Sequence, residues 1–337
     1  MRDINLKNKV VLKLMTRVRF IDIAKGILMV MVVIHHIPAV ANKIGFAFSV
    51  DFKYYNLAIT PFFMPAFFII TGFCSNFSKP IVQFLKNNIK SIIIPGFFLG
   101  IINNWIVLIS ESCTNPIEYL KLGFRTLLLY GGPYWFLSAL FLSKLIYWLI
   151  NRFINDNTLK IFILLLCVFV GVYMYNEFES YNYWYLFHSL MLVPFLYIGK
   201  LVNKVNMNTS YIFLYIAVLC ICYYADSIPT VTATVKMSLL QIPIFIYLSF
   251  TGTMALMYIC NFINNNAILE FFGKNTLIFY GIHISLLFAI FRIVIACDIP
   301  ITFFTILVIF IICILCCSVA SVVLNTRYLR FIIGKFD

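Results

Sequence analysis

Apolar residues follow one another along this chain in long continuous runs, and short polar segments separate the runs. A transmembrane helix needs about 20 mostly apolar residues to cross the hydrocarbon core of a bilayer. Segments of this kind lie at 20–41, 57–77, 89–110, 134–150, 159–176, 183–203, 209–226, 237–260, 276–296 and 301–324. The strands of a membrane β-barrel would instead alternate apolar and polar residues. The pattern therefore predicts an all-α polytopic membrane protein with about ten transmembrane helices.

The composition excludes most other classes of protein. Hydrophobic residues make up 63% of the 337 residues and charged residues 11%, against about 45–50% and about 25% in soluble domains. A soluble enzyme, a disordered chain and a secreted disulfide scaffold are excluded, because too little polar surface would remain. The 10 cysteines lie mostly within apolar runs, where a free thiol behaves as a small apolar group. Their spacing is not that of a zinc site, so we expect no metal.

The basic residues indicate an orientation in the membrane. The formal net charge of +13 would suggest nucleic acid as the partner of a soluble protein, but Lys and Arg of membrane proteins gather in cytoplasmic loops. With a cytoplasmic N-terminus, most of the basic residues fall in inner segments. We therefore expect no nucleic-acid partner and a location in the cell (inner or plasma) membrane. A single integral-membrane domain is expected over 1–337, with cytoplasmic segments at 1–19 and 325–337.

The first span carries the most informative polar residues. A charged group inside a bilayer costs several kcal/mol unless it is paired or hydrated, so it is a functional candidate by default. Asp22 and Lys25 are three residues apart and can pair on one helix face. His36 follows Lys25 by eleven residues, which returns it to nearly the same face about 16 Å further along, whereas His35 points about 100° away. A neutral His36 can act as a general base toward a hydroxyl; for Lys25 the alternative is snorkelling to the interface.

The second span and the loop after it each leave two interpretations open. Pro61 and Pro65 are four residues apart and predict a kinked helix. The carbonyl groups freed by the kink could line a polar cavity, or the kink could serve packing alone. In the following inner loop, Lys86 and Lys90 could bind phosphates or merely set the topology, and their spacing favours topology.

Later polar and aromatic residues are also ambiguous from the sequence. Tyr134 and Trp135 open the fourth span, where an aromatic belt at the membrane interface is the simple interpretation. An intramembrane histidine such as His188 or His283 is often only a hydrogen-bonded packing residue. Arg292 lies nine residues after His283, so the two should face opposite ways on a regular helix.

Taken in order, several of these stretches resemble membrane acyltransferase family 3. Asp22-Ile-Ala-Lys-Gly followed by Val32-Val-Ile-His-His resembles its first-span signature, and most closely that of the fucose 4-O-acetylase-like branch. The family typically carries a basic residue, ten residues and then a histidine, a spacing that Lys25 and His36 fit.

Three further blocks are similar to family motifs and occur in the family's order. Residues 63–72, with Thr71 in place of Ser, resemble a Met-Pro…Ser-Gly block, and Trp135-Phe-Leu resembles a Trp-Phe-Leu block. Gly273-Lys-Asn-Thr with His283 resembles a Gly-Lys-Asn-Ser…His block. An Arg-x-x-Arg pair that many members carry after the second span is missing here, and only Lys86 and Lys90 offer cations in its place.

The resemblance implies transfer of an acetyl or other short acyl group from cytoplasmic acetyl-CoA to a hydroxyl of a cell-envelope carbohydrate or polysaccharide precursor, in some cases lipid-linked. Such a reaction requires deprotonation of the hydroxyl and stabilisation of an oxyanion, and it needs no metal. The expected catalytic residues are His36, Lys25 and Asp22. The expected substrate-binding residues are Lys86, Lys90, Tyr134, Trp135, Asn275 and His283.

Two alternatives belong to other functional classes. A transporter for a polysaccharide or a lipid carrier would also have many spans and buried charges, but the two halves of this chain show no visible repeat. A polysaccharide polymerase would usually bring a long outer loop with arginines, whereas the longest outer loop here carries only Lys121 and Arg125. Dependence on acetyl-CoA separates an acyltransferase from both.

Overall fold

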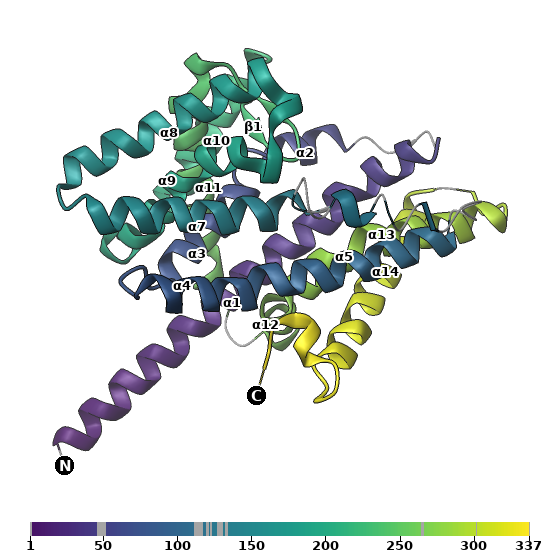
Figure 1. The fold of residues 1–337 in the computed structure, drawn as a ribbon, viewed down its shortest axis with the longest axis horizontal. Helices are drawn as coiled ribbons and strands as arrows, with labels where there is room; N and C mark the ends of the chain where they lie inside the picture. Colours follow the sequence, from purple (N-terminus) through teal and green to yellow (C-terminus); the bar gives the residue numbers. More distant parts are fainter. Residues whose placement is uncertain are drawn as a thin grey trace.

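The chain is folded almost entirely into helices (Figure 1). The computed structural model describes residues 2–45, 52–110, 117–118, 121, 123–126, 131, 134–263, 266–300 and 302–336. The α-helices are α1 (Arg2–Lys43), α2 (Lys53–Ile59), α3 (Phe63–Cys74), α4 (Ile81–Asn88), α5 (Ile94–Ser110), α7 (Trp135–Phe153), α8 (Asn157–Phe178), α9 (Leu186–Leu201), α10 (Ser210–Tyr224), α11 (Ile242–Cys260), α12 (Ala267–Lys274), α13 (Thr276–Ala296) and α14 (Phe303–Leu324). A π-helical turn, η1 (Ile89–Ile93), joins α4 to α5, and β1 (Thr230–Val231) pairs with β2 (Val235–Lys236) in an antiparallel hairpin.

Most of the predicted spans are present as long apolar helices. In the described part of the chain, nine helical segments are long and apolar enough to cross a membrane, and they match nine of the ten predicted spans. The remaining span, predicted at 209–226, is α10, an apolar helix of 15 residues. At 1.5 Å per residue, α10 covers roughly 22 Å, less than the hydrocarbon core of about 30 Å. The all-α polytopic fold class is confirmed, and α10 is shorter than predicted.

Helix α1 organises the part of the bundle that holds the polar residues. Its N-terminal part projects away from the other helices (Figure 1), and the rest packs on α12 and α13 and contacts α3 and α11. The α1–α12 contact is close because both helices carry glycine there. A Cβ atom on Gly273 would lie 1.8 Å from the carbonyl oxygen of Asp22, and one on Gly26 would lie 2.2 Å from that of Leu269. This backbone approach fixes α12, and with it the start of α13, against α1.

The second predicted span is broken at its proline pair, as predicted. Pro65 has no N–H to donate to the carbonyl of Pro61, and the hydroxyl of Ser249 on α11 donates to that carbonyl instead, at 2.8 Å. The carbonyl of Ala58 accepts a hydrogen bond of 2.6 Å from the hydroxyl of Tyr215 on α10. Neighbouring helices therefore satisfy these carbonyls, which favours packing over a polar cavity as the role of the kink.

His188 of α9 connects the bundle to the β1–β2 hairpin. The ring is fully buried, its Nε2 donates to the carbonyl of Thr232 at 3.0 Å, and its Nδ1 accepts from the side-chain amide of Asn182 at 2.8 Å. Both ring nitrogens are used inside the protein. His188 is therefore a hydrogen-bonded packing residue, which is the simpler of the two interpretations of its sequence position.

Candidate functional site

Two adjoining cavities lie along α1. The lysine cavity has a volume of about 490 Å³, and its polar lining consists of Lys25, Thr71, Ser91, Lys144, Thr276 and Tyr280. The histidine cavity has a volume of about 330 Å³, and its polar and aromatic lining includes His35, His36, Lys43, Tyr134, Trp135 and Tyr280. Met64 and Tyr280 line both cavities. The two spaces therefore meet at these side chains.

One stripe of α1 faces both cavities. Lys25 and Met29 line the lysine cavity, and Val32 and His36 line the histidine cavity. Steps of four, three and four residues keep side chains on one face of an α-helix. The prediction that Lys25 and His36 share a face is confirmed, and the structure adds that each side chain faces its own cavity.

His36 lies in a group of three imidazole rings. Its ring centroid is 5.2 Å from that of His35 and 5.0 Å from that of His283 on α13. His35 is held separately, because its Nδ1 is 2.8 Å from the side-chain oxygen of Asn56 on α2. Since that oxygen only accepts, His35 donates from Nδ1. His36 is therefore the ring of this pair that lies beside His283.

His283 is fully buried and its protonation follows from its contacts. Its Nδ1 lies 2.9 Å from the carbonyl oxygens of both Phe279 and Tyr280. Carbonyl oxygens only accept hydrogen bonds, so Nδ1 carries the proton and Nε2 of the neutral ring keeps its lone pair. Arg292, nine residues further along α13, is exposed. The prediction that Arg292 and His283 face opposite ways is confirmed.

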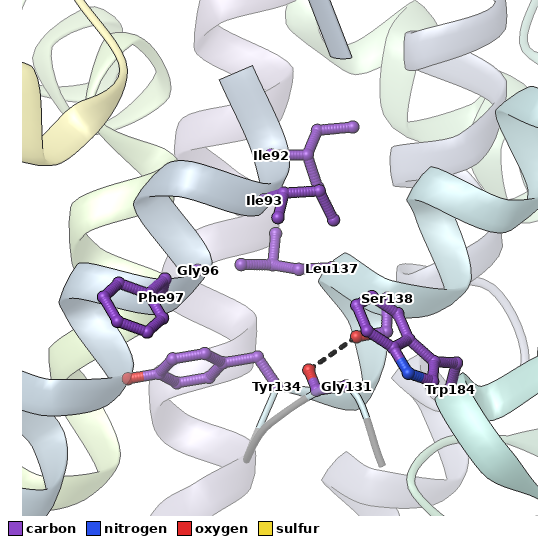
Figure 2. A pocket seen from close by; sticks show the side chains of 9 residues that line it. All are labelled: Ile92, Ile93, Gly96, Phe97, Gly131, Tyr134, Leu137, Ser138 and Trp184. Carbon is purple, nitrogen blue, oxygen red and sulfur yellow. Dashed lines mark hydrogen bonds between the residues drawn. The ribbon is translucent and has the colours of Figure 1, made fainter. Parts of the chain in front are cut away.

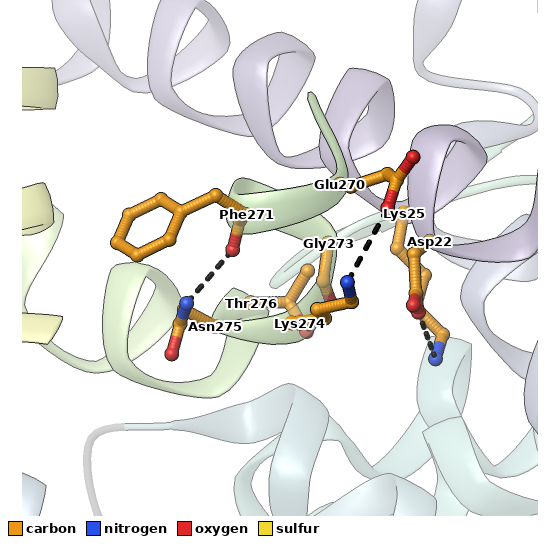
Figure 3. Close-up of polar contacts among 8 residues, drawn as sticks. All are labelled: Asp22, Lys25, Glu270, Phe271, Gly273, Lys274, Asn275 and Thr276. Carbon is orange, nitrogen blue, oxygen red and sulfur yellow. Dashed lines mark hydrogen bonds and ion pairs between the residues drawn. The ribbon is translucent and has the colours of Figure 1, made fainter. Parts of the chain in front are cut away.

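Asp22 pairs with Lys25, whose side chain lines the lysine cavity. Their charged atoms are 3.7 Å apart, and the Lys25 side chain is 29% exposed against 11% for Asp22 (Figure 3). A second pair, Lys274 with Glu270 at 3.3 Å, lies on α12 across the contact with α1. Asp22 does not line the cavity. Its carboxylate instead limits where the ammonium group of Lys25 can go.

Asn275 lies at the junction of α12 and α13 and lines neither cavity. Its amide nitrogen donates to the carbonyl of Phe271 at 2.8 Å (Figure 3), and its amide oxygen accepts from Asn325 at 2.9 Å. The Asn275 side chain thus joins α12, through Phe271, to Asn325, which directly follows α14. Contact between Asn275 and a substrate stays a prediction.

Several cavity residues were not singled out from the sequence. Lys144 of α7 is half-buried and places a second ammonium group in the lysine cavity, and Ser91 of η1 lines the same space. Thr71 and Thr276, which stand where the family motifs have serine, both line this cavity as well. The threonine positions were visible as motif members. Lys144 could only have been noticed as a lysine inside an apolar run.

Lys86 and Lys90 lie outside the lining of both cavities. Lys86 is exposed on α4, and the ammonium group of Lys90 lies 4.9 Å from the ring centroid of Phe336 near the C-terminus. Ser91, the next residue, does reach the lysine cavity. A role of the two lysines in binding substrate phosphates stays a prediction.

Tyr134 and Trp135 line the histidine cavity from the start of α7 and are 4% and 9% exposed. The Tyr134 hydroxyl lies 2.9 Å from the carbonyl of Leu99 and also hydrogen-bonds the carbonyl of Gly281, which ties α7 to α5 and α13. Carbonyl oxygens only accept hydrogen bonds, so this hydroxyl keeps its proton and donates it inside the protein. The burial of both aromatic residues disfavours an aromatic belt at the membrane interface. Because the hydroxyl of Tyr134 is bonded inside the protein, its ring is the part of the side chain available to a ligand.

A small apolar pocket adjoins both cavities. Figure 2 shows this side pocket, which has a volume of about 130 Å³ and is lined by Ile92, Ile93, Gly96, Phe97, Gly131, Tyr134, Leu137, Ser138 and Trp184. It shares Ile92 and Leu137 with the lysine cavity and Tyr134 with the histidine cavity. Its lining is mostly aliphatic and aromatic, so it suits a short apolar group.

Comparison with known proteins assigns the chain to a family. A family model described as an acyltransferase domain matches residues 18–323, a range that contains the α1 stripe, both cavities and the side pocket. No curated protein and no solved structure matches the chain. Because the match covers most of the sequence, the chain belongs to acyltransferase family 3.

Proposed function

We propose that this membrane acyltransferase moves an acetyl, or another short acyl, group from acetyl-CoA to a hydroxyl of a cell-envelope carbohydrate or of its lipid-linked precursor. The observation that carries the proposal is the position of His36. Its ring lines the histidine cavity, and that cavity meets a second, basic cavity at Met64 and Tyr280. A base in one of two adjoining spaces suits a reaction between two substrates that enter separately.

The lysine cavity suits the donor. Coenzyme A carries several phosphate groups, and ammonium groups bind phosphate as point charges. Lys25 and Lys144 place two such groups in this cavity, and Asp22 orients the first. In the proposed topology the N-terminus is cytoplasmic, so this cavity is the one nearer the cytoplasmic supply of acetyl-CoA.

The histidine cavity suits the acceptor. Sites for organic ligands usually combine aromatic walls with a few polar groups that fix orientation. Here the rings of Trp135, Tyr134 and Phe288 form walls, and Lys43 adds a cation. The apolar faces of a sugar ring can pack on such walls while its hydroxyl groups approach His36.

The chemistry follows from a thioester, a hydroxyl and one base. His36 removes the proton of the acceptor hydroxyl while the oxygen forms a bond to the thioester carbonyl carbon, giving a tetrahedral oxyanion. The C–S bond then breaks, and the sulfur of CoA leaves and takes the proton from His36. The acceptor gains an ester, CoA is released as a thiol, and the histidine returns to its neutral form. The thioester is already activated, so the reaction as proposed needs no metal.

The test uses cells with and without the gene, because the acceptor is best found in its own envelope. Glycans from the two strains are compared for O-acyl groups by mass spectrometry, and purified protein in vesicles is assayed for release of CoA thiol from acetyl-CoA with the envelope extract as acceptor. We expect loss of one O-acyl modification without the gene, its return with the wild-type gene, and thiol release by the protein. Unchanged O-acylation, with envelope carbohydrate retained inside the cells or left unpolymerised and no thiol released, would instead support the transporter or the polymerase.

A further inference from the structure

The pair formed by His36 and His283 carries two unused ring nitrogens. Nδ1 of His36 and Nε2 of His283 are buried, and neither has a hydrogen-bond partner in the described part of the chain. The two ring centroids are 5.0 Å apart and the ring planes are inclined by 30°. The two rings are neighbours, but the structure contains no hydrogen bond between these two nitrogens. Buried polar groups are usually paired, so two unpaired nitrogens on adjacent rings call for an explanation.

The hydrogen bonds of His283 determine which of its two ring nitrogens carries the proton. The carbonyl groups of Phe279 and Tyr280 keep the proton of His283 on Nδ1, so its Nε2 can only accept. The one complementary group that the adjacent ring of His36 can offer from its buried edge is an Nδ1–H. A neutral histidine that carries its proton on Nδ1 has its lone pair on Nε2. That nitrogen is the one left to face the histidine cavity, which His36 lines.

We infer that His283 is a positioning residue that accepts a hydrogen bond from Nδ1–H of His36 and so holds Nε2 of His36 as the base that faces the acceptor. The inference rests on the proposed function for its chemistry, in which Nε2 takes the proton of the hydroxyl. During that step Nδ1–H stays on His36 and His283 stays neutral, and the proton on Nε2 later leaves with the sulfur of CoA. The arrangement is the neutral counterpart of the carboxylate that orients the histidine of a catalytic triad.

The surroundings support a hydrogen-bonded pair. Zinc in proteins usually has four ligands, or three and a water molecule, and the described residues contain no cluster of three His, Cys, Asp or Glu arranged for a metal. His35, the nearest third ring, is turned to Asn56. The titratable groups that face the pair are His35 and Lys43 of α1, Tyr134 before α7, Tyr280 of α13 and Cys313 of α14, whose thiol donates to the His283 carbonyl at 3.8 Å. Among the described residues that line the histidine cavity there is no carboxylate, and the adjacent His283 offers an unpaired acceptor in its Nε2.

A first experiment reads the tautomer without any substrate. The chain contains four histidines, so ¹⁵N-histidine-labelled protein in lipid vesicles gives few ring signals, and His36→Ala identifies those of His36. We expect the Nδ1–H form of His36 in the wild type, and a mixture of the two neutral forms in His283→Leu. A wild-type His36 protonated on Nε2, or a spectrum that His283→Leu leaves unchanged, would overturn the inference. This readout does not require the protein to be an acyltransferase, so it separates a failure of the inference from a failure of the proposed function.

A second experiment compares His283→Leu with His283→Gln in the acyl-transfer assay. The Gln side chain can still present an acceptor oxygen near the position of Nε2, whereas Leu cannot. Partners that orient metal-binding histidines contribute about 10–100-fold, and we expect an effect of the same order here. The Leu variant should have a kcat lowered by about that factor with KM for acetyl-CoA within about twofold, and Gln should partially rescue kcat. The acid limb of the pH profile of kcat/KM should move to lower pH in the Leu variant, because His36 loses the acceptor that stabilises its protonated form. Equal loss in both folded variants with an unmoved acid limb, or a change confined to KM, would contradict the inference.

Discussion

Lys25 and His36 lie on one face of α1, eleven residues apart, and face two different cavities that share Met64 and Tyr280. The helix thus connects a cation in the lysine cavity to an imidazole in the histidine cavity through its own backbone. A 1.5 Å rise per residue separates the two functional groups by about 16 Å. In the proposed reaction, much of the acetyl-CoA molecule would lie between the ammonium group and the reacting carbonyl. Under that proposal, the eleven-residue step from Lys25 to His36 separates donor binding from proton transfer along one helix.

The first prediction concerns the histidine pair at positions 35 and 36. His36→Ala should lower the acyl-transfer rate per folded protein by about 10²–10⁴-fold, the usual contribution of a general base. His35→Ala should keep most of the activity, because its ring is bound to Asn56 instead of lying next to His283. Both variants are purified in detergent, checked for folding by size-exclusion chromatography and assayed for release of CoA thiol. Activity in His36→Ala together with its loss in His35→Ala would reverse the assignment of the base.

The fold and the α1 stripe could be predicted from the sequence because both depend on local periodicity. Apolar runs of sufficient length give the helices, and the eleven-residue step from Lys25 to His36 gives the shared face. The contacts between helices could not be predicted in this way. Nothing in the spacing of α13 places His283 rather than His188 next to His36, and both are buried histidines in apolar helices. The resemblance of the Gly273-Lys-Asn-Thr…His283 block to a family motif separates the two histidines, but only the packing of α13 on α1 shows that His283 lies next to His36.

Lys144 shows that the lining of the lysine cavity also could not be predicted from the sequence pattern. In the sequence it is an isolated lysine in an apolar run, with no partner at helical spacing. The packed bundle brings α7 to the same cavity as Lys25 of α1 and Thr276 of α13. The opposite holds for Lys86 and Lys90, which the family resemblance offers as substrate-binding cations but which lie outside the cavity lining. The packing of helices, which the sequence pattern does not determine, decides which lysines line this cavity.

The second prediction therefore compares how much these lysines contribute to KM for acetyl-CoA. Lys144→Gln should raise KM for acetyl-CoA several-fold and change kcat much less, because a phosphate contact remote from the thioester contributes binding that is equal in ground and transition states. The double variant Lys86→Gln, Lys90→Gln should raise this KM by a smaller factor. Steady-state kinetics in vesicles of fixed lipid composition measure both. A larger effect of the double variant would place the phosphates at the inner loop and not in the lysine cavity.

The third prediction concerns the glycine of the Gly-Lys-Asn-Thr block. Gly273→Ala should destabilise the protein, because the new Cβ would lie 1.8 Å from the backbone oxygen of Asp22 and backbone cannot yield as a side chain does. Overpacking of this kind costs about 1–3 kcal/mol. Gly96→Ala is the matched control, since its Cβ would lie at an ordinary 3.4 Å from Cδ1 of Leu137. Melting curves of the two variants in the same detergent provide the measurement; equal melting temperatures would show that α12 can move away from α1 without cost.

The fourth prediction assigns the side pocket to the acyl chain. The pocket adjoins both cavities and is lined mainly by apolar side chains such as Ile92 and Leu137, so the wild-type protein should use propionyl-CoA as well as acetyl-CoA. Gly96→Val directs two methyl groups into this space, where Gly96→Ala adds only one carbon. One methylene in an apolar pocket is worth about 1–3 kcal/mol, or about 10–200-fold in kcat/KM. Gly96→Val should therefore lose propionyl transfer by about tenfold or more and keep acetyl transfer within about twofold, with Gly96→Ala between it and the wild type.

The ratio of kcat/KM for the two donors, measured on each variant, removes differences in the amount of folded protein. A wild-type protein that rejects propionyl-CoA, or a ratio that Gly96→Val leaves unchanged, would show that the acyl chain lies elsewhere.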